Sequence, residues 1–474
     1  MERRALIAAR DISGLGEFSS RISQAHGYRI IAVRAGEGEG VAPDETVEWQ
    51  EARRLIREGE ISLLVANFFD PATVGREHLS WKTALASFDH DIVDLIRLAA
   101  RCPSSMGVVG SPLAYPKALD ELDRNEGAFS RSFRMDQACL ALQAAAEFDA
   151  AVAGYLETHG SEVPDVDALS GYPKSIRFVW KRALGLDQGD TSRQKAAIYG
   201  SFFDHFELVT GPNVDFGCSL DLSVGVYAIG EFEKPTAIVI KNGALQFAAS
   251  ENSIGIAVQK AVEGESQAIA GATLIANGAL ANEDLSLLDD VGIETAMAPS
   301  FPDKIDASAL RLIASREGFG YDALQEVASI PGGAMVQDRN RVAVNPFSWR
   351  LGSAIQPMVD QWDDMIFGVK LSRHLRSDAC VAVRDERLIA KATDLPSQSF
   401  VWSRLAESAE PLQGAALVFD SDIENADTLV EAKNLGIDAV VHPGIDGDAE
   451  THLLEQANEL GLALISTGVS FRKR

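Results

Sequence analysis

Short apolar runs alternate with stretches of helical character at both ends of the chain, and this alternation most constrains the fold. The first run, Ala5–Ala9, is followed by a helix start at Ser13 and by a second apolar run, Tyr28–Val33. Ala416–Phe419 and Ala439–His442 belong to a similar succession near the C-terminus. Strands that alternate with helices form parallel sheets with helices packed on them, so we predict an α/β fold.

The length of the chain predicts more than one domain. A chain of 474 residues is too long for one ordinary hydrophobic core. The stretch 159–174 is rich in Gly, Ser, Pro and Asp, and it is the best candidate for a linker. We therefore predict one domain over residues 1–165 and another over residues 166–474.

Composition excludes several classes of function. The formal net charge is −26, from 43 basic and 69 acidic residues, and such a surface repels a phosphate backbone. We therefore expect no nucleic-acid partner. No apolar run approaches the length that spans a bilayer, so we also expect no membrane association. The cysteines lack C-x-x-C spacing and indicate reduced thiols in a cytoplasmic protein: Cys102, Cys139, Cys218 and Cys380.

One apolar strand ends in a lysine. Five apolar or β-branched residues, starting at Thr236, precede Lys241. We interpret the segment as a buried strand whose end lies where parallel sheets usually place their chemistry. A desolvated lysine there can act as a general acid or base, or it can bind an anion. More commonly, the stem of such a lysine covers apolar surface while its ammonium group reaches water, and both interpretations stay open.

The residues around Lys241 resemble a known motif. The segment Phe232-Glu-Lys-Pro-Thr-Ala-Ile-Val-Ile-Lys-Asn242 is similar to the Lys-His motif of the AICAR transformylase/IMP cyclohydrolase family, and Gln194–Tyr199 and Pro331–Asn340 are similar to further motifs of that family. The resemblance covers nearly the whole chain. It implies a methylglyoxal-synthase-like parallel-sheet N-terminal domain, followed by a transformylase domain made of two cytidine-deaminase-like halves. Because family members are homodimers, it also implies a homodimer.

The cyclohydrolase-like part retains only remnants of the family pattern. Asn67 and Asp89 match family positions, and Arg101 stands where the family has a lysine. The family's long basic segment before the strand that ends at Asn67 has no counterpart, and Ile12 replaces a lysine of the first phosphate-binding turn. The resemblance therefore implies a retained fold without cyclohydrolase activity. We expect one helix over residues 82–101, with Asp89 on its solvated surface.

The transformylase-like part also departs from the family at chemical positions. The family's histidine after the lysine is replaced by Asn242, whose amide cannot titrate near neutral pH. Asp378 replaces an asparagine that would help to position the formyl group. The resemblance implies a degenerate site with catalytic residues Lys241, Asn242 and Asp378 and substrate-binding residues Gly271, Arg193 and Arg376.

The cofactor expected from the resemblance is 10-formyltetrahydrofolate. We predict no metal site, because zinc deaminases need H-x-E and P-C-x-x-C motifs that this sequence lacks. His374 and His442 fall in matched segments, and we interpret both as residues held by packing.

Three functional hypotheses remain open. The leading one is a divergent formyltransferase of one-carbon metabolism, which transfers a formyl group from 10-formyltetrahydrofolate to an amine of a purine-precursor-like or altered acceptor. Its rival is a non-catalytic paralogue that acts as a binding or regulatory scaffold for a protein partner. The third is an authentic transformylase with substituted residues. An apolar, folate-shaped pocket beside Lys241 would favour an enzyme, whereas an acidic or filled pocket would favour the scaffold.

Overall fold

The computed structural model describes residues 2–34, 41–69, 81–159, 172, 176, 178, 180–263, 269–305, 309–316, 325–408, 410–444 and 448–471. The chain forms two compact units, Met1–Val179 and Trp180–Arg474. The predicted boundary between residues 165 and 166 lies outside the described residues, as does most of the predicted linker. Within the described ranges, no helix is both long and apolar enough to cross a membrane.

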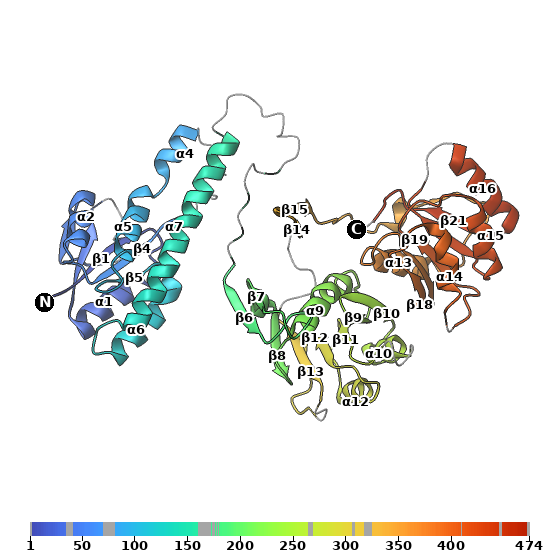
Figure 1. Cartoon of the computed structure of the whole chain (residues 1–474), viewed down its shortest axis with the longest axis horizontal. Helices are drawn as coiled ribbons and strands as arrows, with labels where there is room; N and C mark the ends of the chain where they lie inside the picture. The colour runs from blue at the N-terminus through green and yellow to red at the C-terminus, as the bar shows by residue number, and fades with distance from the viewer. Residues whose placement is uncertain are drawn as a thin grey trace. The chain divides into compact units, whose positions relative to one another are not determined.

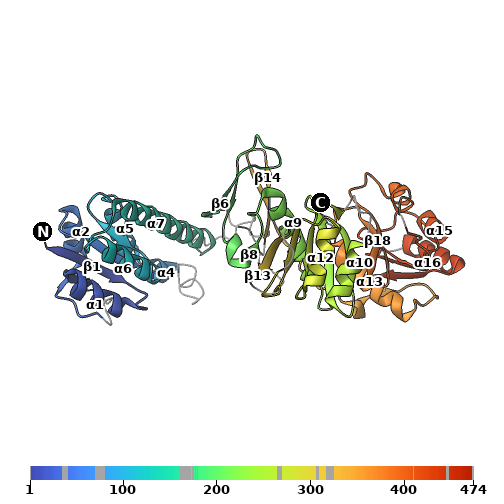
Figure 2. The ribbon, with the colours of Figure 1, turned by 90° about the horizontal axis from the view of Figure 1, so that it is seen from below.

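The N-terminal unit is built on a parallel five-stranded sheet with the strand order β3-β2-β1-β4-β5. The strands are β1 (Arg3–Ala9), β2 (Tyr28–Val33), β3 (Glu45–Val47), β4 (Leu63–Asn67) and β5 (Gly107–Val109). The helices are α1 (Leu15–His26), α2 (Trp49–Arg57), α4 (Trp81–Ser87), α5 (His90–Ala100), α6 (Tyr115–Arg124) and the long α7 (Arg131–His159), which lies beside α5 (Figures 1 and 2).

Helices cover both faces of this sheet because its strands are apolar on both sides. In β1, Leu6 and Ala8 pack with residues of α2, α5 and α7, whereas Ala5 and Ile7 pack with residues of α1 and α6. A parallel sheet buried on both faces is the expected form for such strands. The predicted α/β class is confirmed, while the methylglyoxal-synthase-like arrangement stays a prediction.

Asp89 interrupts the helix that was predicted over residues 82–101. Its backbone is not helical (φ −79°, ψ 47°), and α4 and α5 lie on either side of it. Its carboxylate accepts a hydrogen bond from the Phe69 N–H (3.1 Å) and pairs with Arg10 Nε (2.6 Å). Asp89 is only 7% exposed. The prediction of a solvated surface position is therefore wrong, because the carboxylate turns inward to these two partners.

The C-terminal unit contains a twelve-stranded sheet with the order β16-β21-β20-β19-β17-β18-β10-β9-β11-β12-β13-β8. Its first half consists of α8 (Phe202–His205), β8 (Phe206–Thr210), α9 (Phe216–Ile229), β9 (Thr236–Lys241), β10 (Ala244–Ser250), α10 (Ile254–Val262), β11 (Thr273–Ala276), α12 (Asn282–Asp290), β12 (Thr295–Ala298) and β13 (Arg311–Ser315). Its second half consists of β16 (Arg350–Leu351), α13 (Val359–Ser372), β17 (Cys380–Arg384), β18 (Arg387–Ala392), α14 (Val401–Leu405), β19 (Ala416–Phe419), α15 (Asp427–Asn434), β20 (Ala439–His442), α16 (Asp448–Leu460) and β21 (Ala463–Ser466). Two further hairpins, β6 (Arg182–Leu186) with β7 (Ala196–Tyr199) and β14 (Gln325–Ile330) with β15 (Gly333–Asp338), form sheets of their own.

The two halves repeat one order of elements, coloured green to yellow and orange to red in Figure 1. A helix, α9 or α13, precedes an antiparallel hairpin, β9–β10 or β17–β18, and parallel strands follow. The halves meet where β10 pairs with β18. α9 and α13 share one core, whereas α10 and α12 cover the other face of the first half and α14 to α16 cover that of the second. The cytidine-deaminase-like identity of each half stays a prediction.

A buried aspartate on the first helix of each repeat binds the turn of the following hairpin. Asp221 of α9 accepts hydrogen bonds from the Gly243 N–H (2.6 Å) and the Thr273 hydroxyl (3.0 Å). Asp364 of α13 accepts one from the Glu386 N–H (2.6 Å). Burial raises the pKa of both carboxyls, although these hydrogen bonds oppose it. The carboxylates thus hold helix and hairpin together inside the unit.

The two turns and the two helices also match in backbone detail. Asn242 and Gly243 have φ values of 55° and 71°, and both central residues of the second turn also have positive φ. Positive φ at both positions is typical of the type I′ turns that close two-residue hairpins. A side chain added at Gly225 of α9 would collide with Ile275, and one added at Gly368 of α13 would collide with Val418. Both helices therefore need glycine to lie close to the sheet.

We predict that Asp221→Ala and Asp364→Ala each lower the free energy of unfolding of the C-terminal unit. The change leaves a half-buried turn N–H without its carboxylate acceptor, and loss of such a hydrogen bond costs about 1 kcal/mol or more. Urea unfolding of the full chain measures the loss. Asp363→Ala is the matched control, because Asp363 is the exposed neighbour of Asp364. Unchanged stability of both buried variants would contradict this role.

Candidate functional site

Lys241 lies at an edge of the sheet different from the one predicted. β9 pairs antiparallel with both β10 and β11, so Lys241 lies near the amino ends of the parallel strands β11, β12 and β13. The interpretation of a parallel-strand end is therefore wrong. The physical reason is the Asn242-Gly243 dipeptide, a strong hairpin signal, which turns the chain back into β10.

The side chain of Lys241 holds a loop. Its Nζ donates a hydrogen bond to the carbonyl oxygen of Ala270 (2.6 Å), just before β11. The second repeat has a cation in the same place. Arg384, at the end of β17, donates to the carbonyl oxygens of Pro411 (2.9 Å) and Gln413 (3.2 Å), just before β19. Lys241 therefore has a structural role that its counterpart shares, and its catalytic role stays a prediction.

The other predicted transformylase residues come from different halves. Gly271 follows the carbonyl that Lys241 binds, and its N–H donates to Gly292 O (2.7 Å) at a φ of 75°. Gly414 makes the equivalent bond in the second repeat, to Gly436 O (2.8 Å). Arg376 and Asp378 lie between α13 and β17, and Arg193 lies between β6 and β7. The structure thus brings together Lys241, Asn242 and Gly271, and it places the remaining three in other segments.

We predict that Lys241→Met and Arg384→Met both lower stability, by about 1 kcal/mol for Lys241→Met and by at least as much for Arg384→Met, because Lys241 donates one hydrogen bond to its loop and Arg384 donates two. Chemical denaturation of the full chain measures this. Lys195→Met, at an exposed loop position, is the control. Loss of catalysis in Lys241→Met at unchanged stability would instead favour the catalytic role.

Asn67 and Asp89 lie at the carboxyl edge of the N-terminal sheet. The strand order reverses there, between β1 and β4, and open α/β sheets usually bind ligands at such a point. Asn67 Oδ1 accepts hydrogen bonds from the N–H groups of Arg10 and Asp11 (2.7 Å each), and Nδ2 donates to Asp11 O (2.9 Å). With Arg10 paired to Asp89, the chain's own groups bind one another at this edge. Arg101 caps the far end of α5, away from both.

We predict that Asn67→Ala loosens the β1–β4 edge. The change removes three side-chain hydrogen bonds to the turn after β1, and one such bond contributes about 1 kcal/mol, although the Arg10 N–H keeps its bond to the Asn67 carbonyl. Hydrogen exchange of peptides from β1 and β4, followed by mass spectrometry on the full chain, measures the effect. Asn125→Ala, at an exposed helix end, is the control. Equal protection in the variant and the wild type would show that Asn67 is dispensable there.

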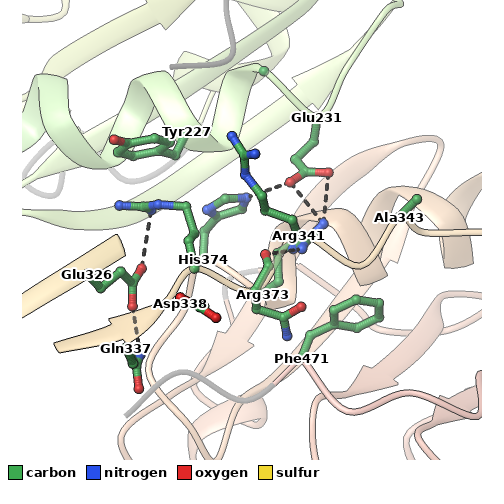
Figure 3. A pocket seen from close by; sticks show the side chains of 13 residues that line it. Tyr227, Glu231, Glu326, Gln337, Asp338, Arg341, Ala343, Arg373, His374 and Phe471 are labelled. Atoms are coloured by element: carbon green, nitrogen blue, oxygen red, sulfur yellow. Dashed lines mark hydrogen bonds and ion pairs between the residues drawn. The ribbon is translucent and has the colours of Figure 1, made fainter. Parts of the chain in front are cut away.

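A cavity of about 710 Å³ lies at the carboxyl ends of α9 and α13 (Figure 3). Four separate segments line it: the end of α9, the β14–β15 hairpin with the chain that follows, the end of α13, and the last described residues. The volume is in the range of small-molecule sites. Sequence reasoning missed this site, because its segments are far apart in the chain.

Arg373 and Glu231 form the fixed part of the cavity wall. Arg373 Nη1 lies 3.0 Å from Glu231 Oε1, and Nη2 donates to Asn340 O (2.8 Å). The guanidinium also lies over the ring of Phe471, 4.9 Å from its centroid. The Arg373 side chain is only 7% exposed. These contacts hold the Glu231 carboxylate in one place.

Two more arginines, Arg339 and Arg341, also line the cavity. Arg339 lies over the ring of Tyr227, 3.7 Å from its centroid, and pairs with Glu326 (3.2 Å). Figure 3 shows Arg341 between Tyr227 and Glu231. With Arg373, three guanidinium groups surround the cavity, and guanidinium groups match phosphate and carboxylate in geometry and charge.

His374 completes a pair with Glu231 at the cavity. Its Nε2 lies 3.5 Å from Glu231 Oε1, and its side chain is 11% exposed. Burial raises the pKa of Glu231, but the close approach of His374 and the charges of Arg373 and Lys370 outweigh burial, so the net pKa lies below its ordinary value. An ionised carboxylate that orients an imidazole is a common arrangement for proton transfer. His442, in contrast, is buried, and burial lowers its pKa to about 4.

An apolar hollow of about 330 Å³ lies between β7 and α9. Tyr199, Phe202 and Phe216 line it, together with Leu220, whose Cβ is the nearest neighbour of the Gly243 turn position. The hollow is mainly apolar, and its Leu220 also borders the turn that follows Lys241, whereas a folate-shaped pocket beside Lys241 itself stays a prediction. Its lining contains no acidic or basic side chain. Acidic and basic side chains are found instead in the lining of the cavity of about 710 Å³.

Comparisons with known proteins assign the family. The family model described as "AICARFT/IMPCHase bienzyme" matches residues 99–397, which is more than half of the chain. The chain therefore belongs to this family. Among the described residues, no group of three or more His, Cys, Asp or Glu side chains is arranged to hold a metal ion, and the absence of a metal stays a prediction.

Curated relatives show how far the chain has diverged. The bifunctional purine biosynthesis protein PurH of Synechococcus sp. (strain CC9311) is 26% identical over 437 residues, covering 86% of this chain and 81% of the relative. PurH of Chlorobium phaeobacteroides (strain DSM 266) is 25% identical over 432 residues, covering 86% and 80%. The solved structure titled "Crystal structure of ForH" aligns at 16% identity over 33% of this chain and 98% of that chain, with a TM-score of 0.26, too low to support the fold assignment. The chain is thus a divergent PurH-family member.

Proposed function

We propose that this protein is a divergent folate-dependent formyltransferase. It transfers a formyl group from 10-formyltetrahydrofolate to an amine of a purine-precursor-like or altered acceptor that carries an anionic group. The observation that supports this most is the cavity at the ends of α9 and α13, which combines three guanidinium groups with a carboxylate and imidazole pair. Family membership supports the reaction class.

The cavity has the groups that such a transfer needs. The guanidinium groups of Arg341 and of Arg339, which also pairs with Glu326, attract a phosphate or carboxylate. His374 with Glu231 offers a site for the proton that the amine loses. Substrate, donor and proton acceptor would thus meet in one space, which shortens the path of the reaction.

We also propose that cyclohydrolase activity is lost. The support is the carboxyl edge of the N-terminal sheet, where Arg10 pairs with Asp89 and Asn67 binds the turn at Asp11. These groups bind one another where an anionic nucleotide would have to bind. A homodimer in the cytoplasm remains part of the proposal.

We predict that Arg341→Gln weakens binding of an anionic acceptor by about 10- to 100-fold, because one charge-assisted hydrogen bond contributes about 1.5–3 kcal/mol. Calorimetric titration with aminoimidazole carboxamide ribonucleotide measures this. The corresponding nucleoside, which lacks the phosphate, should bind both proteins alike. Arg350→Gln, at an exposed position of β16, is the control.

The wild type decides between the enzyme and the scaffold. We expect it to bind a stable folate analogue and to transfer the formyl group of 10-formyltetrahydrofolate to an anionic amine. Absence of binding of both the folate analogue and the ribonucleotide would overturn the enzyme and favour the non-catalytic scaffold. Ring closure of the formylated ribonucleotide by the wild type would overturn the loss of cyclohydrolase activity.

A further inference from the structure

The pair His374 and Glu231 lines the cavity in which the proposed transfer takes place. We infer that His374, oriented by Glu231, is the general base and acid of the formyl transfer, in place of the residue at position 242. The inference rests on the proposed function and names the residue that carries its proton transfer. Sequence reasoning had interpreted His374 as a packing residue.

Position 242 cannot supply this chemistry. Asn242 is a turn residue with a φ of 55°, and its amide has no proton to exchange near neutral pH. Lys241, its neighbour, donates to Ala270 O, a contact that Arg384 repeats in the second half. The hairpin end is therefore occupied with structural contacts, and the imidazole that lines the cavity, His374, belongs to another part of the unit.

The backbone and its neighbours hold His374 in position. The residue follows the end of α13, and its N–H donates to Leu371 O (3.0 Å). Next in the chain, Leu375 is buried in the core that α9 and α13 share. Arg373 fixes Glu231, and Glu231 in turn lies beside the imidazole (Figure 3). Each partner is thus attached to a rigid helix end.

The charges around His374 come from all elements that line the cavity. Glu231 follows α9, and Lys370 and Arg373 lie at the end of α13. Asp338 is the last residue of β15, Arg339 and Arg341 follow that strand, and Glu326 belongs to β14. Of these acids, Glu231 places its Oε1 3.5 Å from Nε2 of the imidazole. When the imidazole gains a proton, the Glu231 carboxylate stabilises the positive charge, while the arginines oppose it unless a bound anion neutralises them. Proton transfer is thereby linked to an occupied anion site.

In the formyl transfer, His374 carries one proton from the acceptor amine to the leaving tetrahydrofolate. The lone pair of the acceptor amine forms a bond to the formyl carbon of 10-formyltetrahydrofolate, and the bond from that carbon to N10 breaks. The nitrogen of the acceptor loses a proton to the imidazole of His374, and N10 of the leaving tetrahydrofolate gains a proton from the resulting imidazolium. No oxidant, reductant or metal is consumed. His374 returns to its neutral form at the end of each cycle.

The decisive experiment compares His374→Gln with the wild type in transfer from 10-formyltetrahydrofolate to aminoimidazole carboxamide ribonucleotide, measured across pH. General acid–base catalysis contributes about 10²- to 10⁴-fold, so kcat should fall by at least about 100-fold while KM changes little. Wild-type kcat should rise with pH as the imidazole loses its proton, and His374→Gln should lack this rise. Glu231→Gln should give a smaller loss of kcat, because the imidazole then lacks its counter-charge.

Matched controls separate catalysis from folding. His452→Gln and Glu233→Gln make the same substitutions at exposed positions and should leave the rate unchanged. Imidazole added to His374→Gln should restore part of the rate, which a merely structural role would not allow. A His374→Gln protein with the wild-type rate and pH profile would overturn the inference and leave the proposed function standing. A wild type without any formyl transfer would overturn both.

Discussion

The buried carboxylates of Asp221 and Asp364 are the contacts on which the C-terminal unit depends. Each joins a helix to a hairpin turn by accepting a hydrogen bond from a half-buried backbone N–H of that turn. Because the aspartates sit within a shared core, the hairpins cannot shift without breaking these bonds. The helix, the hairpin and the parallel strands of each half therefore keep fixed positions relative to one another. The two halves form one sheet through the pairing of β10 with β18.

The cavity is a product of this repeated construction. α9 and α13 occupy equivalent places, so their carboxyl ends reach the same region between the halves. The carboxyl end of a helix carries partial negative charge and favours cations such as Arg373, whereas an acid there is disfavoured. Glu231 follows such an end, and its ion pair with Arg373 offsets the repulsion between the carboxylate and the helix end. The helices thus determine both the place and the polarity of the site.

Local patterns in the sequence predicted the local elements well, but they did not indicate which residues line the cavity. The strand up to Lys241 was located correctly, but the Asn242-Gly243 dipeptide was interpreted as an altered catalytic motif when it closes a hairpin. The long helix over residues 82–101 was predicted from its apolar spacing, which cannot show that Asp89 turns inward to Arg10 and the Phe69 N–H. The sequence alone favours a packing role for His374, because nothing near it in the chain indicates that Glu231 lies beside its imidazole. One signal was available: Asp221 with Gly225 recurs as Asp364 with Gly368, and the same spacing leads to Glu231 in one copy and His374 in the other.

The correspondence between Glu231 and His374 bears on how the two halves arose. If the two halves descend from one unit that once paired with a second copy of itself, positions 231 and 374 were then occupied by identical residues facing each other. Two identical acids at such a distance repel, and two identical imidazoles repel once both are protonated. Fusion of the copies into one chain removes that restriction, because each position can then change alone. A complementary acid and base, 3.5 Å apart, is an arrangement that a symmetric ancestor could not have encoded.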